Sequence, residues 1–157
     1  MNHAEEALGQ FREVIALDLE TLAVLHHAEA GDQLLNHLIM DGFPDGLGLH
    51  LRGKEGVRSL ELMRQAMADL VPPLTEALRD DLAADYAAIY LTYAYHVSPC
   101  ESVWLDQENL GMQAPMFQVR EFYRLFDLAA ASWRTRPDDH LVLELQFLAA
   151  LLRSKHP

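Results

Sequence analysis

The chain has 157 residues, of which 50% are hydrophobic and 23% charged, which fits one globular domain and excludes a disordered or disulfide-stapled chain. Aspartate and glutamate total 24 against 12 for lysine and arginine, so the net charge is −12. Such an acidic surface repels nucleic acid and anionic lipid and attracts basic peptides. A single cysteine forms no internal disulfide, the N-terminus lacks a signal-peptide pattern, and no apolar run is long enough to span a bilayer. We therefore expect a cytoplasmic protein with no nucleic-acid partner and no membrane insertion.

Helical spacing of apolar residues runs through the first two thirds of the chain. In chain order, the predicted elements are a helix over 4–30, a short helix over 32–39, a turn-rich loop over 41–48, a helix over 55–70 and a helix over 74–96. Pro72-Pro73 separates the last two helices, and a further break is predicted near 80–81. Because residues 86–95 are apolar on all sides, we expect this run to be buried on most faces.

The last third of the chain begins with a long irregular stretch over 97–114, a length typical of functional or mobile segments. Helices are then predicted over 115–131 and 141–152, with Thr135 or Asp138 capping the last one. The last helix is apolar on several sides and needs cover from the earlier helices or from another chain. No alternating strand pattern is present. We predict an all-α helical bundle of about six or seven helices in one domain, 1–157, with a hinge near 132–139.

The sequence gives only weak support for a metal-binding site or for a catalytic nucleophile. His140 and Glu144 lie four residues apart on one helix face, but no third ligand stands at a suitable spacing among His26, His27 and His37. Cys100 could act as a nucleophile, although a buried, inert thiol is the better interpretation because no activating base can be placed beside it. His140 in a first helical turn opposes the helix dipole, so it should be neutral or paired with Asp139. No cofactor, metal site or catalytic residue is predicted.

Two segments of the sequence together resemble the TorD/DmsD/NarJ family of redox-enzyme maturation chaperones. The first runs Tyr86-Ala87-Ala88-Ile89-Tyr90 and, after a gap, Ser98-Pro99-Cys100-Glu101-Ser102-Val103-Trp104-Leu105; the second is Arg136-Pro137-Asp138-Asp139-His140, followed by Glu144-Leu145 and Phe147-Leu148. They look like the family's aromatic element, its Pro-x-Glu-Ser-Val-Tyr-Leu loop and its Glu-Pro-x-Asp-His signature. Arg136 replaces the usual acidic residue, and Cys100 stands where some relatives carry an aromatic residue.

The resemblance implies a chaperone, not an enzyme, that binds the twin-arginine leader of a molybdenum-cofactor oxidoreductase. Its partner would be the apo form of the catalytic subunit, held in the cytoplasm for cofactor insertion before export. The implied peptide-binding residues are Tyr86, Ile89, Tyr90, Pro99, Cys100, Glu101, Asp139 and His140. Family members usually continue for several more helices, so a short variant, a fragment or a domain-swapped homodimer is expected.

The residues suit that function, since carboxylates can accept bidentate bonds from arginine and apolar side chains can line a groove. Trp104, Met112 and Met116 are candidate exposed side chains for varied leaders. On spacing alone, however, Tyr86, Tyr90 and Tyr93 are core packing. Three alternatives remain: a NarJ-type assembly chaperone for a non-exported subunit, a metal-dependent helical hydrolase, and a plain helical scaffold.

Overall fold

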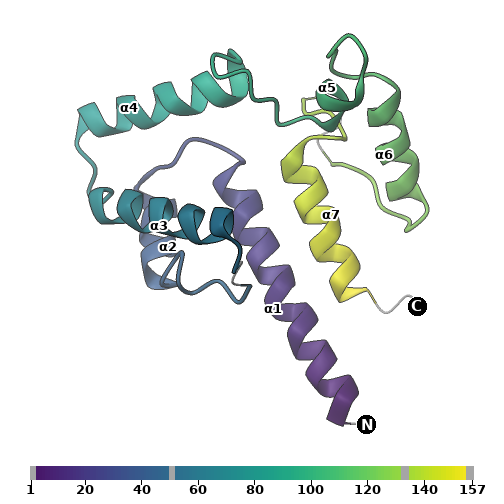
Figure 1. Cartoon of the computed structure of the whole chain (residues 1–157), viewed down its shortest axis with the longest axis horizontal. Helices are drawn as coiled ribbons and strands as arrows, with labels where there is room; N and C mark the ends of the chain where they lie inside the picture. Colours follow the sequence, from purple (N-terminus) through teal and green to yellow (C-terminus); the bar gives the residue numbers. More distant parts are fainter. Residues whose placement is uncertain (1–2, 50–51, 132–134, 155–157) are drawn as a thin grey trace.

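The computed structural model describes residues 3–49, 52–131 and 135–154, and the all-α prediction is confirmed for them (Figure 1). In chain order the elements are α1 (His3–Leu25), α2 (Asp32–Met40), α3 (Lys54–Asp69), α4 (Glu76–Tyr86), the π-helical turn η1 (Ala87–Leu91), α5 (Glu101–Leu105), α6 (Ala114–Arg124) and α7 (Leu141–Arg153). None of these helices is long and apolar enough to cross a membrane.

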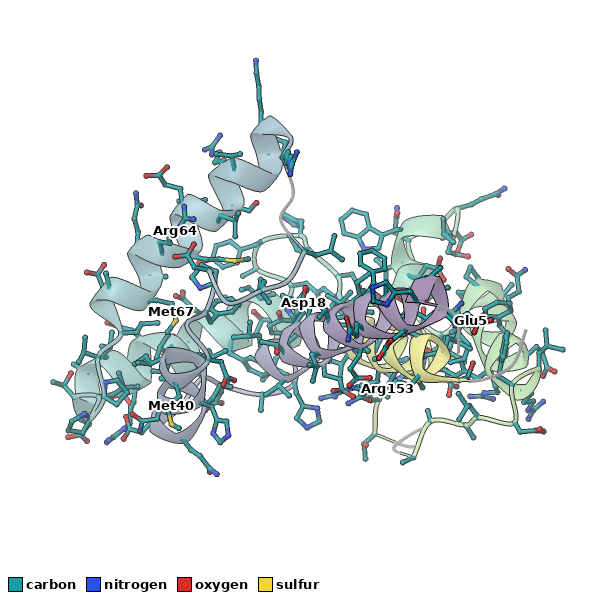
Figure 2. The ribbon with its side chains drawn as sticks, turned by 90° about the horizontal axis from the view of Figure 1, so that it is seen from below. Glu5, Asp18, Met40, Arg64, Met67 and Arg153 are labelled. Carbon is teal, nitrogen blue, oxygen red and sulfur yellow. The ribbon has the colours of Figure 1, made fainter. Side chains whose placement is uncertain are left out.

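Helices α1 and α7 lie side by side and form the most extensive helix–helix contact (Figure 1). Small buried residues, Ala16 and Ala23 on α1 and Ala149 on α7, allow the two backbones to approach closely. Arg153 at the end of α7 bonds to both Glu13 and Glu20 of α1 (Figure 2). The last helix is therefore covered on one face from within the chain.

A separate apolar cluster holds α2, α3 and α4 together on one side of α1. Leu35 and Leu38 of α2 and Leu74 before α4 form its buried centre. Asp32 fixes the arrangement, because its Oδ1 accepts a hydrogen bond from the backbone N–H of Leu74 at 2.8 Å and its Oδ2 pairs with Arg79 at 2.9 Å.

On the other side of α1, helices α5 and α6 pack against α7 (Figure 1). The rings of Tyr123 and Phe122 on α6 lie against the ring of Phe147. The distance to the Phe147 centroid is 4.5 Å from the Tyr123 centroid and 5.6 Å from the Phe122 centroid. Met116, a candidate exposed side chain in the sequence, is buried here, whereas Trp104 and Met112 are exposed. The expectation for Met116 was wrong because α6 turns its face toward the core.

The burial predicted for residues 86–95 is wrong for residues 91–95, which are exposed, whereas residues 86–90 are half-buried. Helix α4 runs without a break at 80–81, passes into the π-turn and ends at Leu91, well before residue 96. Tyr93 and His96 then take positive φ values, which no helix can continue through. Leu91 and Tyr95 are 65% and 60% exposed, whereas Tyr86 and Tyr90 earlier in the run contact the residues that follow α1.

Three other predicted boundaries differ from the structure. The first helix ends at Leu25, where a turn replaces the predicted extension to residue 30. The irregular stretch 97–114 contains α5, and α6 ends at Arg124 because the chain reverses at Asp127, whose φ is 55°. Part of the predicted hinge, residues 132–134, lies outside the described residues.

Candidate functional site

The two segments that carry the family resemblance are hydrogen-bonded to each other. Cys100 and His140 form an antiparallel β-bridge. The N–H of Glu101 donates to the carbonyl of Asp139 at 3.0 Å, and the N–H of Leu141 donates to the carbonyl of Pro99 at 2.7 Å. The start of α5 and the start of α7 are therefore held together, although 40 or so residues separate them along the chain.

Asp139 lies wholly inside this junction. Its Oδ2 accepts a hydrogen bond from the backbone N–H of Ser102 at 2.7 Å, which satisfies one of the free donors at the start of α5. Its Oδ1 is buried and has no hydrogen-bond partner among the described residues. In this arrangement Asp139 positions α5, and direct contact with a peptide would require the start of α5 to move.

His140 is the N-cap of α7. Its Nδ1 accepts a hydrogen bond from the N–H of Val142 at 3.2 Å. Burial, together with the charge of Arg136, lowers the pKa of His140 to about 4, so the ring is neutral near pH 7 as expected. The prediction that Thr135 or Asp138 caps this helix was wrong, since the imidazole nitrogen supplies the acceptor.

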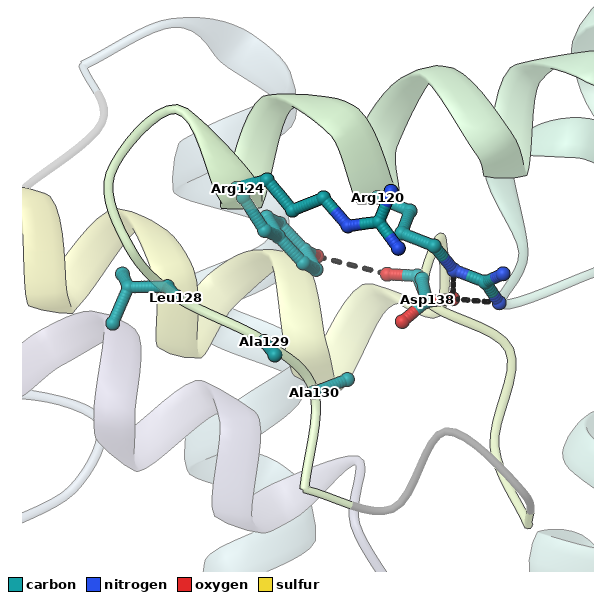
Figure 3. Close-up of a pocket in the computed structure, with 7 residues that line it drawn as sticks. Arg120, Arg124, Leu128, Ala129, Ala130 and Asp138 are labelled. Carbon is teal, nitrogen blue, oxygen red and sulfur yellow. Dashed lines mark hydrogen bonds and ion pairs between the residues drawn. The ribbon is translucent and has the colours of Figure 1, made fainter.

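Asp138 is instead used to anchor the junction to α6 (Figure 3). Its buried carboxylate pairs with Arg120 at 2.6 Å, and its carbonyl accepts a hydrogen bond from the hydroxyl of Tyr123 at 2.8 Å. These groups border a small pocket of about 290 Å³ that Arg124 also lines. Both arginines are already paired, Arg120 with Asp138 and Arg124 with Glu121.

Cys100 is buried, and its surroundings disfavour the reactive thiolate form. Burial and the nearby carboxylates of Asp139 and Glu144 raise the pKa of its thiol to about 11. The thiolate that a nucleophile requires is therefore scarce near neutral pH. The hydroxyl of Ser98 accepts from the N–H of Cys100 at 3.1 Å, and the Ser98 carbonyl accepts from the indole of Trp104 at 2.9 Å, so the segment is fixed from both sides.

The predicted aromatic residues lie at the end of α1. Tyr86 and Tyr90 stack with ring centroids 4.7 Å apart, and Ile89 is half-buried beside them. The hydroxyl of Tyr86 donates to the carbonyl of His27 at 3.1 Å, while a short hydrogen bond joins Tyr90 to His26. Burial lowers the pKa of His26.

His26 and His27 connect these tyrosines to the second motif. Arg136 donates to the ring nitrogen of His27 at 2.8 Å and to its carbonyl at 3.0 Å. His26 and His27 also lie near His140 and contribute to its lowered pKa, so the two halves of the predicted site are electrostatic neighbours. Sequence reasoning treated this histidine pair only as a weak metal candidate and missed its linking role. No group of three metal-ligating side chains occurs within residues 3–49, 52–131 and 135–154.

A groove of about 440 Å³ lies between α6 and α7, next to the junction. Glu101 and Glu144 contribute its carboxylates, and Val119, Phe122 and Leu148 contribute apolar walls. Burial, followed by the negative charges of Glu101 and Asp139, raises the pKa of Glu144 to about 7. Sequence reasoning placed both glutamates near the motifs, but the groove itself depends on how α6 packs on α7.

Glu101 is therefore the one predicted site residue that lines this groove. Pro99, Cys100, Asp139 and His140 form the hydrogen-bonded junction behind it. The arrangement is an apolar trough with two glutamates at its edge.

Comparison with protein families agrees with this geometry. The family model described as nitrate reductase delta subunit matches residues 57–157, which is well over half of the chain and includes every predicted site residue. Comparisons with curated proteins and with solved structures gave no match. The chain belongs to the nitrate reductase delta subunit family, a NarJ/TorD-type family of molybdoenzyme maturation chaperones.

Proposed function

We propose that this protein binds the twin-arginine leader of an apo-molybdoenzyme in the groove between α6 and α7. It would hold that catalytic subunit in the cytoplasm until the cofactor is inserted, without catalysing a reaction itself. Membership of the family supports the chaperone function, and the groove supports the choice of ligand.

The observation that carries the proposal is the pairing of Glu101 and Glu144 with an apolar trough. A twin-arginine leader presents two guanidinium groups followed by an uncharged apolar stretch. Carboxylates can accept bidentate hydrogen bonds from the former, and the side chains of Phe122 and Leu148, each about half exposed, can cover the latter.

Electrostatics favour a cationic ligand at this position. The pKa of Glu144 is raised first by burial and then by the negative charges of Glu101 and Asp139, which repel the ionised form. A guanidinium in the groove would offset that repulsion, so binding should lower the pKa of Glu144 and release a proton. The net charge of −12 would speed encounter with a basic leader, and added salt should weaken that effect.

The other predicted residues support the groove in this proposal. Asp139 and His140 hold the start of α5 and thereby fix Glu101, while Pro99 and Cys100 supply the backbone of the bridge. Tyr86, Ile89 and Tyr90 are also predicted to contact the peptide. They lie beside His26 and would extend the binding surface along the leader.

Calorimetric titration with a panel of twin-arginine leader peptides tests the proposal. Glu101→Gln should weaken binding about tenfold or more, because a charged hydrogen bond contributes about 1.5–3 kcal/mol. Glu108→Gln removes an exposed carboxylate outside the groove and is the matched control. Equal affinities for parent and Glu101→Gln would place the leader elsewhere.

A second candidate is assembly of a non-exported nitrate-reductase-type subunit, which the family description favours. The same groove would then bind an N-terminal segment that needs no arginine pair. Replacing both arginines of the bound peptide by lysine separates the two cases, since lysine cannot make the bidentate contact. Retained affinity would favour the non-exported client. Measuring the molecular mass of the complex in solution would show whether two copies of the chain form the groove together, as in a homodimer.

A further inference from the structure

A second groove, with a volume of about 620 Å³, lies between α1 and α2. Leu17 and Val24 of α1 form one wall, and Leu34 and Leu38 of α2 form the other. Leu17 and Val24 are 52% and 51% exposed, although they stand seven residues apart on one helix face. These residues precede the range 57–157 matched by the family, so the groove is a feature of this chain's own N-terminal part.

The ends of this α1–α2 groove are acidic. Glu29 lies just before α2 and Asp41 is its C-cap, so the two carboxylates mark opposite ends of the helix. Neither forms an ion pair with any residue that the structure describes, and none of the described residues lining the groove is lysine or arginine. The negative end of the α2 dipole adds to the charge of Asp41. Met40, labelled in Figure 2, is the last residue of α2 and is 84% exposed.

We propose that the α1–α2 groove docks a basic amphipathic helix of a partner protein, at a site separate from the leader groove. An apolar trough between two helices fits the apolar ridge of a third. Helix α2 has nine residues, about 13 Å of helix, and Glu29 lies before its first turn, so the docked helix should carry two cations about 11 residues apart, a spacing that places both on the same helical face.

The negative charge of the chain favours a basic partner over a second copy of the chain as the occupant of the groove. Each copy carries −12, and the first turn of α1 contributes Glu5 and Glu6, so a self-docked α1 would bring negative charge to an acidic rim. A basic partner gains attraction at both ends of the groove instead. The inference does not rest on the leader proposal, because different elements line the two grooves.

A synthetic peptide of about 14 residues provides the probe, with leucines along one helical face and a lysine near each end. Its fluorescence anisotropy is measured on titration with the full-length protein. One control peptide has the same composition with both lysines in the middle, and a second has glutamates in place of the lysines. The end-lysine peptide should bind most tightly, and its advantage should shrink as salt rises.

Two pairs of matched variants assign the binding to this groove. The double variant Leu17→Gln, Val24→Gln should weaken binding about tenfold, whereas Leu8→Gln, Phe11→Gln on the same helix but outside the groove should not. All four side chains are exposed, so both variants should fold, as circular dichroism can verify.

The charge pair gives the second test. Glu29→Gln, Asp41→Asn should weaken binding about fivefold at low salt, while Asp80→Asn, Asp81→Asn removes two exposed charges from α4 and should leave it unchanged.

Three results would overturn the proposal. The first is equal binding by Leu17→Gln, Val24→Gln and the parent protein. The second is displacement of the probe by leader peptide, which would mean a single shared site. The third is concentration-dependent self-association that the same double variant abolishes, which would make the groove an interface between copies. Failure of leader binding with retained probe binding would refute only the leader proposal.

Discussion

Replacing Glu144 by glutamine should change how the stability of the protein depends on pH. The pKa of Glu144 is raised from its ordinary 4.5 to about 7, so the folded chain holds this proton more tightly than the unfolded chain does. Its contribution to stability is complete below pH 4.5 and is lost as pH rises through about 7. By the linkage relation, this loss of stability amounts to about 2 kcal/mol between pH 5 and pH 8.

His140 acts in the opposite direction. Its pKa is lowered from 6.5 to about 4, so its contribution is complete above pH 6.5 and is lost as pH falls toward 4. Between pH 4.5 and 6.5 the two residues therefore offset each other in the parent protein. Glu144→Gln leaves only His140, and comparison of the two proteins at each pH cancels the part due to His140.

Urea denaturation followed by circular dichroism measures the difference. The difference in unfolding free energy between Glu144→Gln and the parent should shift in favour of the variant by about 2 kcal/mol from pH 5 to pH 8. Glu108→Gln, which alters an exposed carboxylate outside the groove, should show no such trend. If the advantage of Glu144→Gln is the same at both pH values, the groove does not hold Glu144 in the environment described, and the argument for a cationic ligand there fails with it.

Three further predictions concern the fold around the site. Arg120→Met leaves the buried carboxylate of Asp138 without its partner and should lower unfolding free energy by about 3 kcal/mol in the same urea assay; a loss below about 0.5 kcal/mol would contradict the anchoring role. Gly46→Ala would place a Cβ 2.0 Å from a backbone carbonyl oxygen and should lower the unfolding free energy, whereas Gly9→Ala has open space in a helix and should raise the unfolding free energy by about 0.5–1 kcal/mol. Cys100 should resist iodoacetamide at pH 8 until urea unfolds the chain, as mass spectrometry can follow; rapid labelling of the native protein would show that the junction is open.

The sequence predicted helices well where the apolar period was regular and the ends carried clear signals. The predicted span 141–152 lies within α7, and the prediction of 32–39 differs from α2 by one residue. The prediction of burial failed at residues 91–95, because composition reports how apolar a segment is but not whether another element packs against it. Leu91 and Tyr95 lie exposed after a π-turn that spacing alone does not indicate.

Individual roles at the site were harder to predict than its location. The motif residues do come together, as the bridge between Cys100 and His140 shows. Asp138 has the right chemistry for a helix cap, yet the long-range pair with Arg120 engages it, and His140 caps α7 instead. Such choices depend on partners distant in the chain, which a local pattern does not contain.

The bridge between Cys100 and His140 also makes hydrogen exchange a way to follow the opening of this part of the molecule. It joins the two ends of a long chain segment that contains α5 and α6 and ends at the start of α7. A loop clasped at its base opens as one cooperative unit, so the amide protons of Glu101 and Leu141, both bonded across the clasp, should exchange with deuterium at a common rate. A ligand that pulls the start of α5 away from α7 would speed both together, whereas one that settles onto the closed surface would slow them.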